Sequence, residues 1–204
     1  MEDFVKKIVV FSQRVEVIES YNERRDCIDQ RVSIFLSECG YLPIALPNNI
    51  ELVDAIISTL NPVGIVLTGG NSLTKYGGDA PERDATDKRL IDIAIAQGIP
   101  LYGLCRGMQS ILDYFGETLI NVDGHVAKRH KISGDIIGDV NSYHNQACIM
   151  LQKESVFRIS AKSKDEVIEA IYHKNLPIVA NMWHPEREIN LKKTDIERVK
   201  KLFG

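Results

Sequence analysis

The sequence has no excess of basic residues and no long hydrophobic run. Lysine and arginine number 25 among 204 residues against 28 aspartate and glutamate residues, so the net charge is −3. No strongly basic face is therefore expected, which argues against nucleic acid as the main partner. The longest apolar runs, such as Ile8–Phe11, are far too short to cross a bilayer, so no membrane association is expected.

Cysteine is scarce, and its spacing is not that of a disulfide framework. The four cysteines are Cys27, Cys39, Cys105 and Cys148, with no C-x-x-C pair among them. This spacing argues against structural disulfides and a zinc knuckle, and it favours reduced thiols in the cytoplasm. The N-terminal residues Met1–Asp3 are acidic where a signal peptide would be basic, which also indicates a cytoplasmic protein.

The composition excludes a disordered chain, because 44% of the residues are hydrophobic and 26% are charged. The sequence contains no internal repeat, no low-complexity tract and no linker rich in proline, glycine or serine. Residues 1–204 are therefore predicted to form a single domain. The sequence leaves homo-oligomerisation open.

Short β-branched runs alternate with amphipathic segments in the first two-thirds of the chain. This alternation predicts right-handed βαβ units, hence an α/β three-layer sandwich with a mostly parallel sheet and helices on both faces. In such sheets ligands bind beyond the carboxyl ends of the strands. The last third adds partly antiparallel strands before a C-terminal helix from about residue 194. The predicted strands are 8–11, 42–46, 63–67, 100–104, 156–161, 167–172 and 178–183, and the predicted helices are 32–39, 52–60, 84–97 and 106–115.

A cysteine lies where one of these strands turns into a helix. Residues 103–107 read Gly-Leu-Cys-Arg-Gly, the thiol version of the nucleophile elbow. In that turn the side chain projects over the strand end, and the helix N-terminus favours the thiolate, with Arg106 adding positive charge. The N–H of Arg106 also points to where an oxyanion would form. The sequence thus favours Cys105 as a nucleophile, whereas the other three cysteines are interpreted as small buried hydrophobic residues.

A thiol nucleophile needs a base, and the base needs a group that orients it. Among five histidines, His184 follows the strand 178–183 and lies two residues before Glu186, with a proline stiffening the chain between them. Glu186 could hold the imidazole in one tautomer, although a histidine that only satisfies a polar strand end fits the sequence equally well. The Gly69–Gly70 turn after strand 63–67 would supply an oxyanion donor if its N–H faces Cys105.

Three motifs in this order resemble the class I glutamine amidotransferase-like fold, and the resemblance covers nearly the whole chain. They are Leu67–Gly70, Gly103–Gln109 and Trp183–Glu186. Two further stretches, Pro81–Asp84 and Val140–Ala147, are similar to the γ-glutamyl hydrolase branch, the family of γ-glutamyl-γ-aminobutyrate hydrolase. The resemblance implies a flavodoxin-like α/β fold with a few antiparallel strands in a mostly parallel sheet.

The resemblance also assigns catalytic roles. It implies that Cys105 is the nucleophile, that His184 is the base and that Glu186 orients the base, so that the three form a catalytic triad. It implies in addition that Gly70 and Arg106 supply backbone N–H groups to the oxyanion.

Binding of the glutamyl group is implied for a second set of residues. Gln109, four residues after the nucleophile, would face the glutamyl group. The stretch Ser142, Tyr143 and His144 would hold its α-amino and α-carboxylate groups, largely through backbone contacts, with His144 either touching the substrate or lying behind it. Without the resemblance, residues 141–146 read as an ordinary polar turn.

The chain departs from the family in being short between residues 119 and 140, a stretch that carries the basic segment His125–Lys131. One interpretation is that Lys128, Arg129 and Lys131 meet an anionic leaving group such as a phosphate, and the other is a solvated loop. In length and in this segment, the chain is similar to small γ-glutamyl hydrolases of capsule biosynthesis. Those enzymes release a nucleotide phosphoramidate (CDP-amidate) from its γ-glutamyl conjugate.

The predicted activity is hydrolysis of the γ-glutamyl amide bond of a small-molecule conjugate through a thioester, releasing glutamate and an amine or amidate. No metal and no organic cofactor are expected. The alternative is a glutaminase subunit that delivers ammonia to a separate synthase. A binding module without chemistry is a further alternative, against which the intact set of Cys105, His184 and Glu186 argues.

Overall fold

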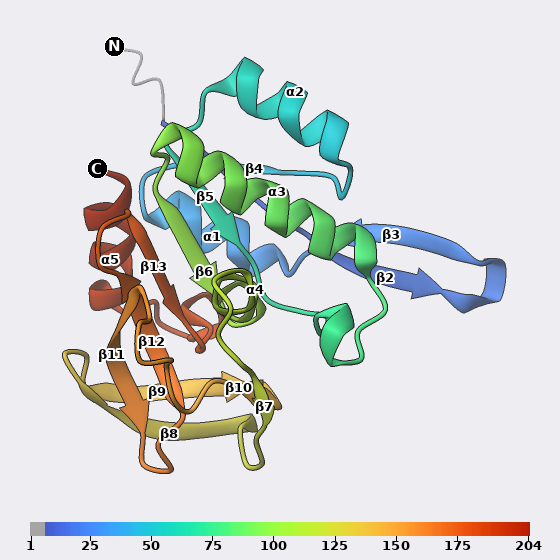
Figure 1. Cartoon of the computed structure of the whole chain (residues 1–204). Coiled ribbons are helices and arrows are strands. Elements are labelled where there is room, and N and C mark those ends of the chain that lie inside the picture. The colour runs from blue at the N-terminus through green and yellow to red at the C-terminus, as the bar shows by residue number, and fades with distance from the viewer. Residues whose placement is uncertain (1–6) are drawn as a thin grey trace.

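The structure is a computed structural model that describes residues 7–204. A nine-stranded sheet runs through it in the order β4-β1-β5-β6-β13-β12-β11-β8-β9 (Figure 1). The strands are β1 (Ile8–Phe11), β4 (Leu42–Ala45), β5 (Gly64–Leu67), β6 (Leu101–Leu104), β8 (Val126–Gly134), β9 (Gly138–Tyr143), β11 (Phe157–Ser163), β12 (Ile168–His173) and β13 (Ile178–Asn181). The helices are α1 (Gln30–Glu38), α2 (Ile50–Leu60), α3 (Pro81–Gln97), α4 (Arg106–Tyr114) and α5 (Lys193–Phe203).

The sheet has a parallel half and an antiparallel half. The strands from β4 to β13 in this order run parallel, and β12, β11, β8 and β9 continue the sheet antiparallel. This confirms the predicted α/β fold with a mixed sheet around a parallel core. Two smaller ribbons complete it: β2 (Arg14–Ile18) pairs with β3 (Glu23–Cys27), and β7 (Ile120–Asn121) pairs with β10 (Gln146–Ala147).

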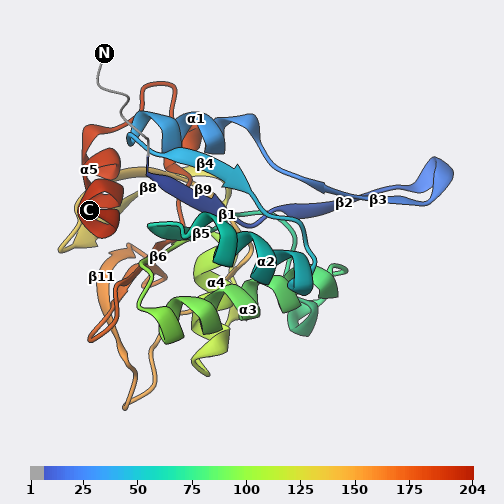
Figure 2. The same ribbon diagram turned by 90° about the horizontal axis from the view of Figure 1, so that it is seen from above.

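Alternate residues of the parallel strands bury opposite faces of the sheet, as the period of two in a strand requires. On one face, Val10 and Ile65 pack with residues of α2, α3 and α4. On the other, Val9 and Val66 pack with α1 and α5. The helices therefore form a layer on each side of the sheet (Figures 1 and 2).

The predicted strands and helices of the first two-thirds are present, with small differences at their ends. Helix α3 begins at Pro81 rather than at Asp84, because a proline at the first helical position fits the helix without needing its missing N–H. Gly98 ends this helix in the left-handed conformation, with φ of 68°.

Two hairpins were not predicted. The basic segment, for which a solvated loop was one of two interpretations, lies largely in β8, paired in register with β9 (His130 opposite Val140). The β2–β3 hairpin projects far from the sheet (Figure 2), and most of its residues are exposed. Both were missed because their strands are mainly charged and exposed, so they lack the apolar alternation that indicates a strand.

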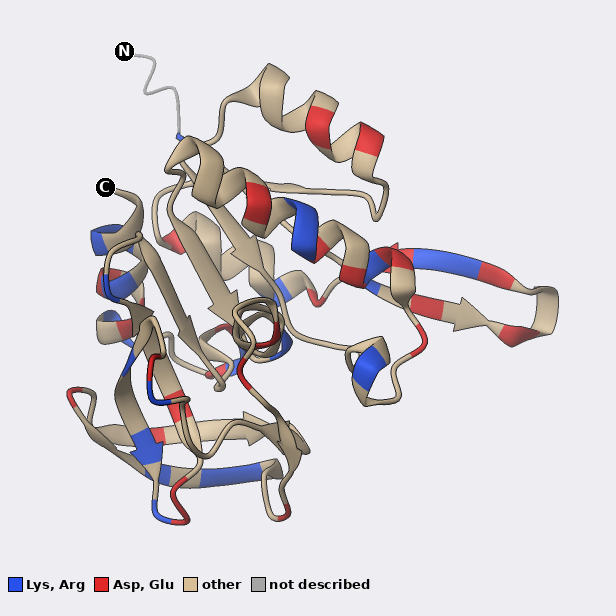
Figure 3. Ribbon diagram, viewed as in Figure 1, with Lys and Arg blue, Asp and Glu red and all other residues tan. Residues whose placement is uncertain are grey.

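Charges of both signs are spread over the ribbon, with a group of lysine and arginine along β8 (Figure 3). Within residues 7–204, no helix combines the length and the apolar character needed to span a membrane.

Candidate active site

The carboxyl ends of three neighbouring strands meet at one edge of the sheet. Strand β6 pairs in parallel with β5 on one side and with β13 on the other. The chain leaves β5 toward Gly69–Gly70, leaves β6 at Cys105 and leaves β13 toward His184. The fold thus brings the three sequence motifs together at the position where such sheets bind ligands.

The turn at Cys105 has the backbone of a nucleophile elbow. Cys105 has φ of 50° and ψ of −104° and caps the N-terminus of α4, while its N–H donates to the carbonyl of Asn181 at 2.8 Å. A non-glycine residue rarely adopts positive φ unless its surroundings hold it there. The flanking glycines permit this packing: a Cβ at Gly107 would lie 2.1 Å from the carbonyl oxygen of Leu67, and one at Gly103 would also clash.

His184 is held by a carboxylate and by an amide. Its Nδ1 lies 2.7 Å from Oε1 of Glu186, and both side chains are buried. The side chain of Asn141 fixes the His184 backbone, accepting from its N–H and donating to its carbonyl, each at 2.8 Å. A Cβ at Gly69 would lie 2.7 Å from Cε1 of His184 and 3.6 Å from Cβ of Cys105, so the imidazole and the thiol lie side by side over Gly69.

The electrostatics of His184 favour its charged form. Burial lowers the pKa of its imidazole, but the charges of Cys105 and Glu186 and hydrogen bonds to both outweigh burial and raise that pKa to about 9. This arrangement suits a thiolate paired with an imidazolium, and a thiol, an imidazole and a carboxylate in sequence are the groups that nucleophilic catalysis requires.

A cavity of about 350 Å³ opens above these groups. Cys105 and His184 line it together with the predicted residues Gln109, Tyr143 and His144. Predicted residues from distant parts of the sequence therefore share one hollow.

The predicted glutamyl-binding residues do not all face this cavity in the same way. Gln109 lines it while its side-chain N–H₂ donates to the carbonyl of Gln146 at 2.8 Å. Ser142 is fully buried, and its hydroxyl turns away to donate to the carbonyl of His125 at 2.6 Å. His144 contributes to the wall, and its Nε2 lies 3.6 Å from a carboxylate oxygen behind it, that of Glu169.

Arg83 supports the floor of the site from within the protein. Its guanidinium is fully buried and donates to the carbonyls of Thr68 (2.7 Å), Gly69 (3.0 Å) and Gly70. The Gly69 carbonyl and the Gly70 N–H belong to the same trans peptide and therefore point in opposite directions. Because the Gly69 carbonyl faces Arg83, the Gly70 N–H points away from Arg83. Burial, together with the nearby charge of Arg106, lowers the pKa of Arg83 to about 9, which still leaves the group charged at neutral pH.

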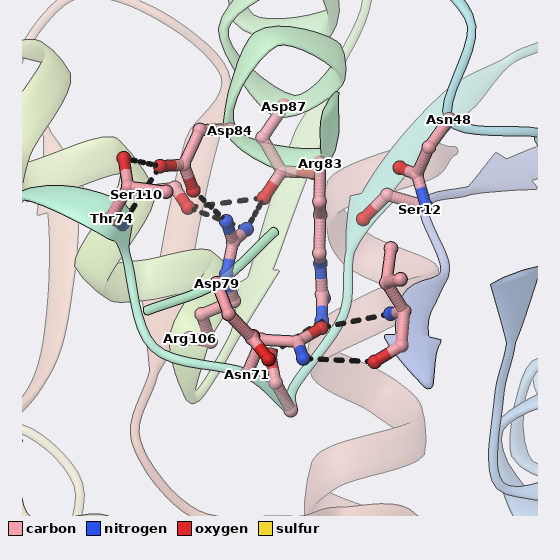
Figure 4. A network of polar contacts seen from close by, with 12 residues as sticks. Ser12, Asn48, Asn71, Thr74, Asp79, Arg83, Asp84, Asp87, Arg106 and Ser110 are labelled. Carbon is pink, nitrogen blue, oxygen red and sulfur yellow. Dashed lines mark hydrogen bonds and ion pairs between the residues drawn. The ribbon is translucent and has the colours of Figure 1, made fainter. Parts of the chain in front are cut away.

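Arg106 turns its side chain away from the thiol. The guanidinium is buried and pairs with Asp84 and Asp87 of α3, and it donates to the hydroxyl of Ser110 at 3.0 Å (Figure 4). Its charge is thus committed to joining α4 to α3. The Arg106 backbone N–H lies in the first turn of α4, where it has no carbonyl partner within the helix.

Two cationic side chains at the cavity were not anticipated from the sequence. Arg14, from the first strand of the projecting hairpin, and Arg187 both line the cavity. The Arg187 guanidinium lies 4.6 Å from the ring centre of Tyr143, over its face. Only the position of Arg187 beside the Glu186 motif could have drawn attention to it, since nothing in the local sequence of Arg14 points to this site.

Comparison with known proteins supports a relationship over nearly the whole chain. The family model described as glutamine amidotransferase class-I matches residues 24–201. A γ-glutamyl-CDP-amidate hydrolase of Campylobacter jejuni is 32% identical over 188 residues, which cover 91% of this chain and 92% of that protein. A γ-glutamyl-γ-aminobutyrate hydrolase of Escherichia coli O157:H7 is 28% identical over 72% of this chain and 73% of its own.

A solved structure has the same architecture. It is that of a protein described as a GMP synthase subunit from Thermoplasma acidophilum, with a TM-score of 0.70, 20% sequence identity, and coverage of 97% of this chain and 93% of that one. At this identity the likeness bears on the fold alone.

Proposed function

Because the chain belongs to the class I glutamine amidotransferase family, we propose that it is a hydrolase that cleaves the γ-glutamyl amide bond of a small conjugate with Cys105 as nucleophile. The observation that carries this proposal is that Cys105 and a carboxylate-bound His184 lie side by side over Gly69 and line one cavity. The names of the two relatives, both γ-glutamyl hydrolases, support the choice of substrate class.

The first half of the reaction transfers the acyl group to sulfur. The Cys105 thiolate attacks the γ-carbonyl carbon, and the imidazolium of His184 then gives its proton to the leaving nitrogen as the C–N bond breaks. Glu186, bound to Nδ1, leaves Nε2 as the ring nitrogen that is free to exchange a proton with the sulfur, and it stabilises the cationic ring. The products of this half are a γ-glutamyl thioester on Cys105 and the free amine or amidate.

The negative oxygen of the tetrahedral intermediate needs donors that are already in place. The N–H of Arg106 at the start of α4 and the N–H of Gly70 would supply them, the latter aimed by the grip of Arg83 on the neighbouring carbonyls. Removal of one of these two N–H donors typically lowers the reaction rate by about 10²–10³-fold.

In the second half of the reaction, His184 takes a proton from water, the hydroxide attacks the thioester, and the C–S bond breaks to release glutamate and the thiolate.

The glutamyl half and the amine half occupy two adjoining cavities in this proposal. Gln109, Tyr143 and His144 would hold the glutamyl group. A second cavity, lined by Lys128 and Arg129, adjoins the first across Tyr143 and Arg187. We propose a nucleotide phosphoramidate such as CDP-amidate as the amine half, because Lys128 would meet its phosphates, whereas Arg129 is already paired with Asp139 and Glu188.

A panel of γ-glutamyl conjugates tests the function, with glutamate release as the readout. It runs from simple alkylamines to nucleotide phosphoramidates and includes glutamine. The proposal expects turnover of at least one γ-glutamyl amide, reduced by at least about 10⁴-fold in Cys105→Ala and His184→Ala variants that keep the wild-type circular dichroism. Hydrolysis retained in Cys105→Ala would refute it. Turnover of glutamine only after addition of a second protein would favour the glutaminase subunit.

Lys128→Gln tests the phosphoramidate assignment, with Lys131→Gln on the same strand as the matched control. Lys128 lines the cavity beside Tyr143, whereas Lys131 lines a different one. The assignment expects Lys128→Gln to raise KM for the phosphoramidate and not for a γ-glutamyl alkylamide, while Lys131→Gln changes neither. An equal effect of Lys128→Gln on both substrates would contradict it.

A further inference from the structure

Three histidines surround a buried glutamate behind the cavity wall. Glu169 of β12 is fully buried, and its Oε1 lies 3.1 Å from Nε2 of His130, 3.4 Å from Nδ1 of His125 and 3.6 Å from Nε2 of His144. His125 directly precedes β8, His130 lies within β8, His144 directly follows β9, and Glu169 lies in β12. No spacing in the sequence relates His125 and His130 to a ligand, because β12 brings Glu169 to them from a distant part of the chain.

The polar atoms of this cluster lie close together but lack hydrogen-bond partners. Among the described residues, neither oxygen of Glu169 has a hydrogen-bond partner, and the same holds for Nδ1 of His125, Nε2 of His130 and both ring nitrogens of His144. The three contacts have the length of ion pairs but not the alignment of hydrogen bonds. An unsatisfied buried carboxylate is costly, so positive charge is expected among these atoms.

The contact of His125 with Asp165 determines which ring nitrogen of His125 carries the proton. Its Nε2 lies 2.9 Å from Oδ2 of Asp165, and Oδ1 of Asp165 accepts a hydrogen bond from the hydroxyl of Ser163 at 2.5 Å. The Asp165 carboxylate therefore holds the proton on Nε2 and leaves a lone pair on Nδ1, directed at Glu169. A histidine held by a carboxylate on one nitrogen, with the other nitrogen free, is the arrangement that metal ligands adopt.

The distances from Glu169 to the three histidines are close to those between the ligands of a tetrahedral ion. Ligands about 2.0–2.1 Å from a tetrahedral zinc ion lie about 3.3 Å from one another, and the three distances to Glu169 fall on either side of that value. The ligand atoms of His125, His130 and Glu169 all lie within 4.8 Å of one another. We infer that these three residues bind a divalent transition-metal ion of the zinc type, with Nε2 of His144 as the fourth ligand.

Such an ion would be structural, and the hydrolytic reaction does not pass through it. It would join β8, β9 and β12 at one point and fix the turn at His144, whose backbone N–H already donates to the carbonyl of His125 at 3.0 Å. Ser142 is tied to the same carbonyl. The metal would therefore hold the wall that Tyr143 and His144 present to the cavity. A separate hollow lined by His125, His130 and Asp165 offers the ion a way in from solvent.

Zinc titration of the purified, chelator-stripped full-length protein tests the site, by competition with a chromophoric chelator. The inference expects one equivalent to bind tightly, and Co²⁺ in its place to give the intense visible bands of tetrahedral coordination. Glu169→Gln should weaken zinc binding by more than about 100-fold. Asp165→Asn, at a side chain that is 57% exposed and so tolerates substitution, should weaken it by about 10–100-fold.

Two controls distinguish this site from zinc bound elsewhere on the protein. Glu117→Gln alters a buried glutamate outside the cluster and should leave zinc affinity unchanged. Cys105→Ser removes the thiol of the neighbouring cavity and should also leave it unchanged. Zinc binding in the wild type no tighter than in Glu169→Gln, or binding that disappears with Cys105, would overturn the inference. Weak Co²⁺ bands typical of octahedral coordination would also overturn the inference. An absence of zinc binding would overturn it as well, and would show that protons alone stabilise the cluster.

Discussion

Arg83 shows how a side chain behind the site can control the chemistry in front of it. Its guanidinium fixes three successive carbonyls and so decides where the Gly70 N–H points. The family motif around residues 81–84 drew attention to this stretch, but its local sequence does not indicate which backbone groups Arg83 meets. That information is in the tertiary contact between α3 and the turn after β5.

Substitution of Arg83 should therefore reduce both rate and stability. Arg83→Gln is expected to lower kcat by about 10²–10³, the cost of losing one oxyanion donor, and to lower the free energy of unfolding by about 3–5 kcal/mol because buried acceptors lose their partner. Arg89→Gln, on the same helix with an exposed ion pair to Asp54, should change both by little. Equal kcat values for the two variants would exclude a positioning role.

The pKa of His184 predicts a pH dependence of stability. Its folded-state pKa of about 9 lies above its ordinary value of 6.5, so the folded state binds the proton more tightly than the unfolded state. This stabilisation is complete below about pH 6.5 and is lost as the pH rises through 9, and it amounts to about 3 kcal/mol at most.

Urea unfolding between pH 6 and pH 8.5 follows most of this loss and stays below the ordinary thiol pKa of 9.0, above which the buried Cys148 would add a loss of its own. Cys105→Ala removes the first charge that raises the pKa of His184, so the decline in unfolding free energy over this range should become shallower. Cys148→Ala, at a buried cysteine outside the cavity lining, should keep the wild-type slope. A wild-type slope in Cys105→Ala would show that the two side chains are not coupled.

At the scale of elements, the contact of α4 with β5 determines whether the elbow can form. A Cβ at Gly107 would meet the backbone of Leu67 at 2.1 Å, where no side-chain movement can relieve the clash. Gly107→Ala should therefore lower the free energy of unfolding by about 3 kcal/mol or more. Gly138→Ala, where an added Cβ meets nothing within 4 Å, is the matched control. Thermal unfolding compares them, and equal midpoints would contradict this account.

The elements that were predictable are those whose pattern is local. Strands β1, β5 and β6 are short, wholly apolar runs, and β5 and β6 lead into glycine-containing turns. The site was marked by Cys105 after β6 and by His184 after β13, each within a recognisable motif. Strand β8 was not predictable, because its side chains are mostly exposed and charged and its apolar partners lie in other strands. The Glu169 cluster was missed for the same reason: no sequence spacing relates a residue of β12 to the histidines around it.

At the scale of the whole molecule, one sheet carries both halves of the fold. Strand β13 joins them, pairing in parallel with β6 and antiparallel with β12. Trp183, the only tryptophan, follows β13 and is buried against the small cluster between β8, β9, β11 and β12. The guanidinium of Arg198 in α5 lies over the Trp183 ring, 4.9 Å from the ring centre, so Trp183 also contacts α5.

This arrangement predicts that the chain unfolds as one unit. Trp183 fluorescence should report the antiparallel half and far-ultraviolet circular dichroism the whole chain, and in urea the two should give coincident transitions. Two separated transitions would indicate that the halves are independently stable and would contradict a single domain.

The account depends most on Cys105 being the atom that receives the γ-glutamyl group. A glutamine-shaped electrophile, with a chloroketone or diazoketone in place of the γ-amide, tests this directly when the labelled protein is digested and its peptides are weighed by mass spectrometry. We predict one adduct per chain, on Cys105, formed at least about 10²-fold more slowly in His184→Ala. An adduct on Cys27, Cys39 or Cys148, or loss of activity without modification of Cys105, would contradict the account.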